Sequence, residues 1–290
     1  MVAVPRACVF RCAVEIAIGV EHRAAVRVRA VPTAEVVEID DAAQLAAIGQ
    51  LEYPAVIMVL CPRNWTAVVS RRVRGNIFGV SQNGGAYNDG AVFELTPSAS
   101  GWTERVIYSF TDGLDGVAPS GQLAIDSLGN LYGIANGGQF RVGVVFELGP
   151  SQSGWTETTL FSFGSSPAIG VYPVGGLILD ASDNLYGNTT YNYQGNGPGS
   201  VFELSPSGGR WSCHAIYQVP GDGEGAGEFA PPAMDSAGNL YGTTTGFVPD
   251  GGSYGTVYEL TPSGQSWVYT QLHQFNLTDG EAPNRASRLT

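Results

Sequence analysis

Four glutamates recur at the same place in four copies of a short apolar phrase. Each is the third residue of "VFEL" or "VYEL": Glu94, Glu147, Glu203 and Glu259. A carboxylate in the middle of an apolar strand is costly unless it is paired or hydrated. Around a shared channel, the four could form a ring that holds a cation. If they face Thr or Tyr hydroxyls on a neighbouring strand, their role is structural.

Acidic loops are the other candidates for metal binding. "DGLDG" at 112–116 and "GDGEG" at 221–225 could supply oxygen ligands to calcium. A calcium loop needs several oxygens at set spacing, as in an alternating D-x-D-x-D run, and neither stretch has one. We therefore interpret both as turns and expect no cofactor, with calcium as the one ion that the acidic composition would suit.

Nucleophilic catalysis finds little support. Cys213 and His214 are adjacent in a predicted strand, so they point to opposite faces and cannot form a thiolate–imidazole pair. No serine elbow and no phosphate loop occurs in the sequence. A pair of carboxylates, for example Glu203 and Asp222, could still support polysaccharide hydrolysis or lysis, which is the alternative to a non-catalytic protein.

A phrase repeated at fixed spacing must position all these residues. "GNIFG" at Gly75, "GNLYG" at Gly129, "DNLYG" at Asp183 and "GNLYG" at Gly238 are spaced by 54, 54 and 55 residues. A catalytic motif is needed once, whereas a structural unit that stacks on copies of itself is needed many times.

Each copy predicts a sheet of four strands. In the third, the apolar runs are 175–180, 184–190, 200–205 and 211–219, bounded by Gly, Pro, Asn, Asp and Ser. The runs leave both faces of the sheet largely apolar, so each sheet must pack against the next. The recurring tryptophans and the Phe or Tyr of the repeated phrase are accordingly predicted to pack between sheets, rather than to bind sugar: Trp102, Trp155, Trp211, Trp267, Phe78, Tyr132, Tyr186 and Tyr241.

The predicted fold is all-β: a β-propeller-like array of about four four-stranded antiparallel blades in residues 75–290. "DGEAPNRASRLT" at the end aligns with the approach to a first strand and could close the ring by pairing with the opening blade. The alternatives are an open propeller fragment and a β-solenoid. Residues 1–74 are unassigned. We interpret them as a mis-assigned start or a degraded repeat, because "NWTAVVS" at 64–70 resembles "GWTERVIYSF"; the alternative is a small α/β appendage with a helix near 41–50 and a strand near 55–60.

Composition separates the same two parts and restricts the partners. All 14 basic residues are Arg; nine lie before Gly75, leaving five against 19 acids in 75–290, a net charge of −14. That excludes a nucleic-acid partner, which needs clustered cations. The longest apolar stretch, 53–62, is too short to span a bilayer. Arg6 and Arg11 precede an apolar run that Glu15 interrupts, so no convincing signal peptide is present.

The connections between second and third strands vary while the strands repeat. Variable loops on a rigid scaffold are where recognition usually resides, although flexible glycine-rich linkers would show the same variation. The predicted ligand-binding residues are the aromatic members of these loops: Tyr87, Phe140, Tyr191, Tyr193, Phe247 and Tyr254.

The phrases "GNLYGTTT…GGSYGTVYELTPSG" at 238–264 and "IYSFTDGLDGVAPSGQLAIDSLGNLYG" at 107–133 resemble the GloVer-type tandem repeat of bacterial choice-of-anchor proteins. The resemblance implies a secreted or cell-surface protein with propeller architecture and no established activity. We therefore expect a monomeric extracellular scaffold or binding module with a glycan or cell-surface partner.

Overall fold

The structure is a computed structural model. It describes residues 57–61, 65–73, 75–99, 101–195, 198–219, 231–244, 254–264, 266–276 and 278. Every regular element within these ranges is a β-strand, which confirms the all-β prediction.

The strands form four consecutive antiparallel units. Units 2 to 4 have four strands each, and unit 1 has five. Unit 1 is β1 (Ile57–Cys61), β2 (Trp65–Val73), β3 (Asn76–Ser81), β4 (Ala91–Ser98) and β5 (Gly101–Ser109); unit 2 is β6 (Val117–Ile125), β7 (Leu131–Asn136), β8 (Val144–Ser151) and β9 (Gly154–Ser162); unit 3 is β10 (Val171–Leu179), β11 (Leu185–Tyr191), β12 (Ser200–Ser207) and β13 (Arg210–Gln218); unit 4 is β14 (Ala233–Met234), β15 (Leu240–Thr244), β16 (Thr256–Ser263) and β17 (Ser266–Gln274).

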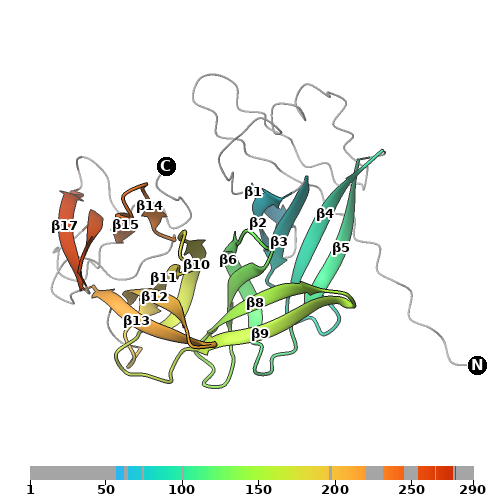
Figure 1. Cartoon of the computed structure of the whole chain (residues 1–290), viewed down its shortest axis with the longest axis horizontal. Helices are drawn as coiled ribbons and strands as arrows, with labels where there is room; N and C mark the ends of the chain where they lie inside the picture. Colours follow the sequence, from blue (N-terminus) through green and yellow to red (C-terminus); the bar gives the residue numbers. More distant parts are fainter. Residues whose placement is uncertain are drawn as a thin grey trace, which may run out of the picture.

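The units follow one another along an open arc, with β5 towards one end and β17 at the other (Figure 1). Units 2 and 3 meet through their first strands, where β6 and β10 run parallel at Gln122 and Gly176. The open propeller-like arrangement is therefore the form that the structure shows. The predicted closing strand lies in 279–290, outside the described residues.

Unit 1 begins before the boundary at 74/75 that composition indicates. β2 contains most of "NWTAVVS", pairs with β1 on one side and pairs with β3 on the other. The sequence resembles a fourth strand of the repeat, but β2 lies between β1 and β3 and takes the place that the first strand has in units 2 to 4. Residues 1–56 lie outside the described residues.

The glycine of each repeated phrase makes room for an aromatic ring on the next strand. Gly133 in β7 lies directly opposite Phe146 in β8. A Cβ at Gly133 would lie 2.7 Å from Leu123 Cδ2 and 2.9 Å from Phe146 Cε1, which is too close for carbon atoms. The same pairing recurs as Gly79–Phe93, Gly187–Phe202 and Gly242–Tyr258. The two recurring phrases are thus two halves of one packing contact.

The turn between first and second strands is built on an aspartate, as predicted. Asp126 Oδ1 accepts hydrogen bonds from the backbone N–H groups of Leu128 and Asn130, both at 2.9 Å. Gly129 takes a positive φ of 93° within this turn, a conformation that glycine adopts without strain. Asp180 and Asp235 make the same backbone bonds in units 3 and 4.

Successive units pack face to face through aromatic side chains. The Trp of each following unit contacts the Phe or Tyr of the preceding unit's repeated phrase. The ring centroids are 5.8 Å apart for Phe78–Trp155, 6.1 Å for Tyr132–Trp211 and 6.0 Å for Tyr186–Trp267. Trp155, Trp211 and Trp267 therefore pack between units, as the sequence predicts. The same prediction is wrong for Trp102, which is 39% exposed because no described unit packs on that face of unit 1.

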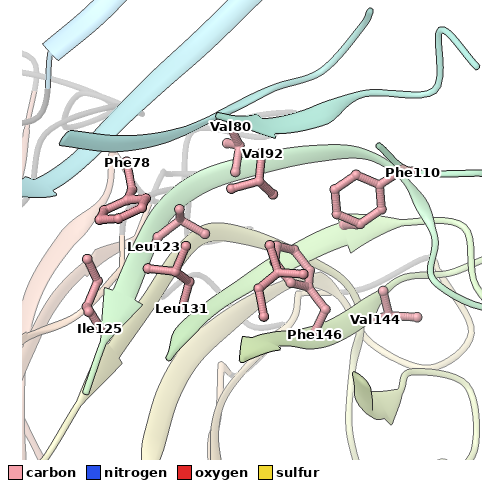
Figure 2. Packing of buried hydrophobic residues seen from close by; sticks show 11 residues of the cluster. Phe78, Val80, Val92, Phe110, Leu123, Ile125, Leu131, Val144 and Phe146 are labelled. Carbon is pink, nitrogen blue, oxygen red and sulfur yellow. The ribbon is translucent and has the colours of Figure 1, made fainter. Parts of the chain in front are cut away.

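A continuous core lies between units 1 and 2, as Figure 2 shows. Phe78, Val80, Val92 and Phe110 come from unit 1, and they face Leu123, Ile125, Leu131, Val144 and Phe146 of unit 2. Phe110 and Phe146 are both fully buried and meet edge to face at 5.1 Å. Neither sheet could bury this surface alone.

Candidate functional site

Exposed aromatic side chains gather where the second strands end. Tyr87 lies between β3 and β4 with 64% of its surface exposed, and Phe140 lies between β7 and β8 with 43% exposed. Tyr191 and Tyr193 follow from the end of β11, with 45% and 42% exposed. Because β6 and β10 run parallel, units 2 and 3 have the same orientation, and their loops with Phe140, Tyr191 and Tyr193 extend from the same edge.

Hydrogen bonds hold the first two of these loops at their ends. The Gly90 N–H donates to Gly84 O at 3.1 Å, and the Gly143 N–H donates to Gly137 O at 2.9 Å. The backbone of Phe110 donates to Gly90 O and that of Phe163 to Gly143 O, so each loop is also tied to the fourth strand of its unit. The loops are therefore held by backbone hydrogen bonds at their bases.

The next unit holds each of these loops from the other side. Ala118 N–H at the start of β6 donates to Asp89 O, and Tyr172 N–H at the start of β10 donates to Val142 O, both at 2.8 Å. The connection between second and third strands thus contributes to the junction between units.

Tyr172 is also exposed beside Tyr191, although it lies in a first strand and was therefore not among the aromatic loop residues that the sequence predicts. It lies in β10, where its neighbour Val171 pairs with Tyr191 at the end of β11. Its ring is 40% exposed and meets Tyr191 edge to face at 6.1 Å. Its φ of 59° is one that a non-glycine residue rarely adopts. The replacement of Ala118 in "GVAP" by Tyr172 in "GVYP" was the available sequence signal.

We call the surface formed by Tyr87, Phe140, Tyr172, Tyr191 and Tyr193 the aromatic loop face. Tyr254 is half-buried in the corresponding loop of unit 4, and Phe247 lies outside the described residues.

A charged pair lies beside Phe140. Arg141 Nη1 contacts Asp112 Oδ1 at 2.6 Å, and both side chains are largely exposed. Arg141 follows the second strand of unit 2, whereas Asp112 lies between units 1 and 2. The pair supplies charged hydrogen-bond donors and acceptors beside the aromatic ring.

The acidic loop "DGLDG" is saturated by protein donors. Asp115 accepts hydrogen bonds from the Thr111 N–H and hydroxyl, from the Gly113 N–H and from the Tyr108 hydroxyl, at 2.7 to 3.1 Å. Burial, and then the Asp115 carboxylate, raise the pKa of Tyr108. The tyrosine therefore stays protonated and donates. This loop is a turn, whereas 221–225 lies outside the described residues.

The strand glutamates lie in separate local networks. In units 3 and 4 a tyrosine of the repeated phrase donates to the glutamate: Tyr186 to Glu203 at 3.3 Å and Tyr241 to Glu259 at 2.7 Å. Each tyrosine hydroxyl also contacts the turn aspartate of its own unit. The hydrogen bond to Glu259 is the main cause that raises the pKa of Tyr241 to about 12.

Unit 2 has a weaker version of this network. Tyr132 donates to Asp126 at 3.1 Å. Burial, and then the charge of Asp126, raise the pKa of the Glu147 carboxyl. Ionised Glu147 is therefore disfavoured in the folded protein.

Unit 1 stabilises its glutamate by a different route. Phe78 replaces the tyrosine and offers no hydroxyl. Glu94 instead accepts a hydrogen bond from Asn76 Nδ2 at 2.7 Å, and Arg105 Nη2 contacts it at 2.6 Å. Arg105 lies directly opposite Glu94 on the neighbouring strand, where the other units have Thr158, His214 and Thr270. Unit 1 thus lacks the tyrosine hydroxyl that donates to the glutamate in units 3 and 4, but Arg105 donates to Glu94 instead.

Cys213 and His214 point to opposite faces, as predicted. Cys213 packs beside the core of units 2 and 3, and burial raises the pKa of its thiol. His214 is exposed, and its Nε2 lies 2.9 Å from Ser212 Oγ. Glu203 is held by Tyr186 and Ser205, and Asp222 lies outside the described residues, so no pair of catalytic carboxylates can be assigned.

Within the described residues, no group of three or more His, Cys, Asp and Glu side chains could hold a metal ion. The same part of the chain contains no helix long and apolar enough to cross a membrane.

A match to a family of repeats agrees with the repeat architecture. A family model described as Gloeobacter/Verrucomicrobia repeat matches residues 63–226. No curated protein matches the chain. A solved structure of a protein of unknown function from Dyadobacter fermentans is similar, with 13% sequence identity and a TM-score of 0.45 over 71% of this chain and 68% of that chain.

Proposed function

From the premise that this chain belongs to the Gloeobacter/Verrucomicrobia repeat family, we propose that it is a non-catalytic binding module whose aromatic loop face takes carbohydrate. The observation that carries the proposal is the exposure of four tyrosines and a phenylalanine on the connections of three successive units. Exposed aromatic clusters on soluble proteins mark interaction sites, because water contact with apolar rings is unfavourable.

Carbohydrate fits this surface better than a purely apolar ligand. An aromatic ring offers a flat apolar face to the C–H groups of a sugar, and a tyrosine hydroxyl can bond to sugar hydroxyls. Arg141 and Asp112 supply further polar groups beside Phe140. The net charge of −12 disfavours polyanionic glycans, so the preferred ligand is neutral.

The fixed loop bases support recognition at low entropic cost. Tyr172 and Tyr191 contact each other across neighbouring strands, so their rings are oriented before any ligand arrives. Binding sites that need little rearrangement lose less conformational entropy on association. We further propose that the protein acts outside the cell or at its surface, where polysaccharide is available.

The test is a glycan array followed by calorimetry with the neutral polysaccharide that binds. Tyr172→Ala and Tyr191→Ala should each weaken binding by about tenfold, the typical cost of losing one good interface contact. Leu128→Ala is a matched control, because Leu128 is 80% exposed on the turn between β6 and β7. Binding that survives both tyrosine variants, or no binding to any neutral glycan at millimolar concentration, would refute the proposal.

A further inference from the structure

The two ends of the arc expose complementary halves of the junction that the molecule forms three times. We define the leading face of a unit as the one that contacts the following unit, and the trailing face as the one that contacts the preceding unit. Phe78 of unit 1 lies on a leading face, and Trp155 of unit 2, which contacts it, lies on a trailing face. Among the described residues, unit 1 therefore ends the arc with a trailing face, and unit 4 ends it with a leading face.

The leading face of unit 4 is more open than its three counterparts. Tyr241 is half-buried, whereas Phe78, Tyr132 and Tyr186 have at most 6% of their surface exposed. Val257 is half-buried as well, although the corresponding Val92, Val145 and Val201 are fully buried. Phe275 is also half-buried, whereas the corresponding Phe110 and Phe163 are fully buried.

The trailing face of unit 1 is open in the same way. Trp102 is 39% exposed, whereas the tryptophans of units 2 to 4 are half-buried against a tyrosine or phenylalanine. Ile77 and Leu95 are half-buried, but their counterparts in the other units are fully buried. Those counterparts are Leu131, Leu185 and Leu240 for Ile77, and Leu148, Leu204 and Leu260 for Leu95.

We propose that the leading face of unit 4 binds the trailing face of unit 1 in a second copy of this chain. The contact continues the internal junction with the same residue types: Tyr241 against Trp102, and Phe275 against Phe93. An apolar face that every internal unit buries is costly to leave in water. A heterologous contact of this kind forms a ring when its rotation closes, and two copies would make a two-fold ring of eight units.

The first test is the mass of the full-length protein across a concentration series, by size-exclusion chromatography with light scattering. Association should appear as a mass of twice 30.4 kDa or more. Each chain carries a net charge of −12, so association should strengthen when salt is raised to about 0.3 M and the repulsion is screened. A monomer at every concentration and salt would overturn the proposal, including the case in which another segment of the chain covers the two faces.

The second test assigns the association to the two faces. Trp102→Arg and Tyr241→Arg should each raise the dissociation constant by at least about 30-fold, the effect of losing one interface hot spot. Leu128→Arg adds the same charge on an exposed turn and should leave the constant unchanged. Far-UV circular dichroism checks that all three variants keep the β-fold.

Mixing separates a head-to-tail contact from any other. An equimolar mixture of the Trp102→Arg and Tyr241→Arg proteins retains one intact pair of faces, because each variant carries the face that the other has lost. The mixture should associate more tightly than either variant alone. Association that neither variant weakens, or a mixture no tighter than its components, would overturn the proposal.

Discussion

The pairing of glycine with an aromatic ring across neighbouring strands can be tested by adding a single carbon. In Gly133→Ala, the new Cβ would lie 2.9 Å from Phe146 Cε1 and 2.7 Å from Leu123 Cδ2. Both neighbours are fully buried, so neither ring nor methyl group can move aside without disturbing the junction with unit 1. We therefore expect the substitution to destabilise the protein.

The magnitude follows from two opposing effects. Overpacking a well-filled core typically costs about 1–3 kcal/mol. Replacing glycine by alanine also restricts the unfolded chain, which offsets about 0.4–1 kcal/mol of that cost. The expected net loss is roughly 1–2 kcal/mol in the free energy of unfolding. Phe146→Leu should cost about 1 kcal/mol or more, since it removes the edge contact with Phe110 but keeps an apolar side chain.

The informative quantity is the coupling between the two substitutions. Phe146→Leu removes the ring that the new Cβ would strike, so the double variant should be more stable than the sum of the single effects by about 1 kcal/mol. Urea unfolding followed by circular dichroism and tryptophan fluorescence measures all four proteins. Gly187→Ala with Phe146→Leu is the control pair, because Gly187 lies opposite Phe202 in unit 3. Additive effects in the Gly133 and Phe146 pair would refute the packing argument.

Three further predictions concern the glutamates and the tryptophans. Glu147→Gln should raise the melting temperature at pH 7. The pKa of Glu147 is raised in the folded protein, so its carboxyl binds more protons in the native state than in the unfolded chain. The free energy of unfolding therefore falls as the pH rises above the ordinary glutamate pKa of 4.5. An equal gain at pH 3.5, measured by thermal unfolding, would contradict this. Arg105→Leu should lower the free energy of unfolding by about 1–3 kcal/mol, because it leaves the buried Glu94 with fewer partners. Phe78→Tyr in the same protein should restore part of that loss, because it supplies the tyrosine hydroxyl that the other units have. If urea unfolding shows no such recovery, the exchange of donors is wrong. Trp211→Ala should lower the free energy of unfolding by about 2–3 kcal/mol, because Trp211 packs on Tyr132 within the chain. Trp102→Ala should lower it by less than about 1 kcal/mol in dilute protein, because Trp102 is exposed. Equal losses in urea unfolding would contradict the different packing of the two tryptophans.

Strands, turns and the packing role of the tryptophans could be predicted because each rests on local sequence repeated in register. "GNLYG" and "VFEL" fix the second and third strands, and an Asp three residues before the phrase fixes the preceding turn in units 2 to 4. Repetition supplied the missing evidence: the tryptophan that recurs at one position meets the aromatic ring of the repeated phrase in units 2 to 4, although Trp102 of unit 1 is exposed.

Features that depend on the relation between copies were harder to predict. Whether the arc closes depends on small rotations between units, which no residue pattern encodes. The place of β2 in unit 1 could not be predicted, because "NWTAVVS" resembles a fourth strand of the repeat. Only its pairing with β3 shows that it takes the place of a first strand. Tyr172 was missed because it begins a first strand, outside the loops that vary most in length.

The partners of some strand glutamates could be predicted from the sequence, whereas the partner of another could not. Their pairing with tyrosine hydroxyls in units 3 and 4 was one of the two arrangements that the sequence left open. The partner of Glu94 could not be foreseen, because Arg105 reaches it from a strand whose other copies carry neutral or weakly basic residues.

Packing between units can be tested most directly by hydrogen–deuterium exchange on the full-length Trp211→Ala protein. Trp211 begins β13 of unit 3 but contacts Tyr132 in β7 of unit 2. We predict faster amide exchange in β7 and β8 as well as in β12 and β13, with β3 and β4 of unit 1 unchanged. Faster exchange confined to unit 3 would contradict the conclusion that each sheet depends on the neighbouring copy.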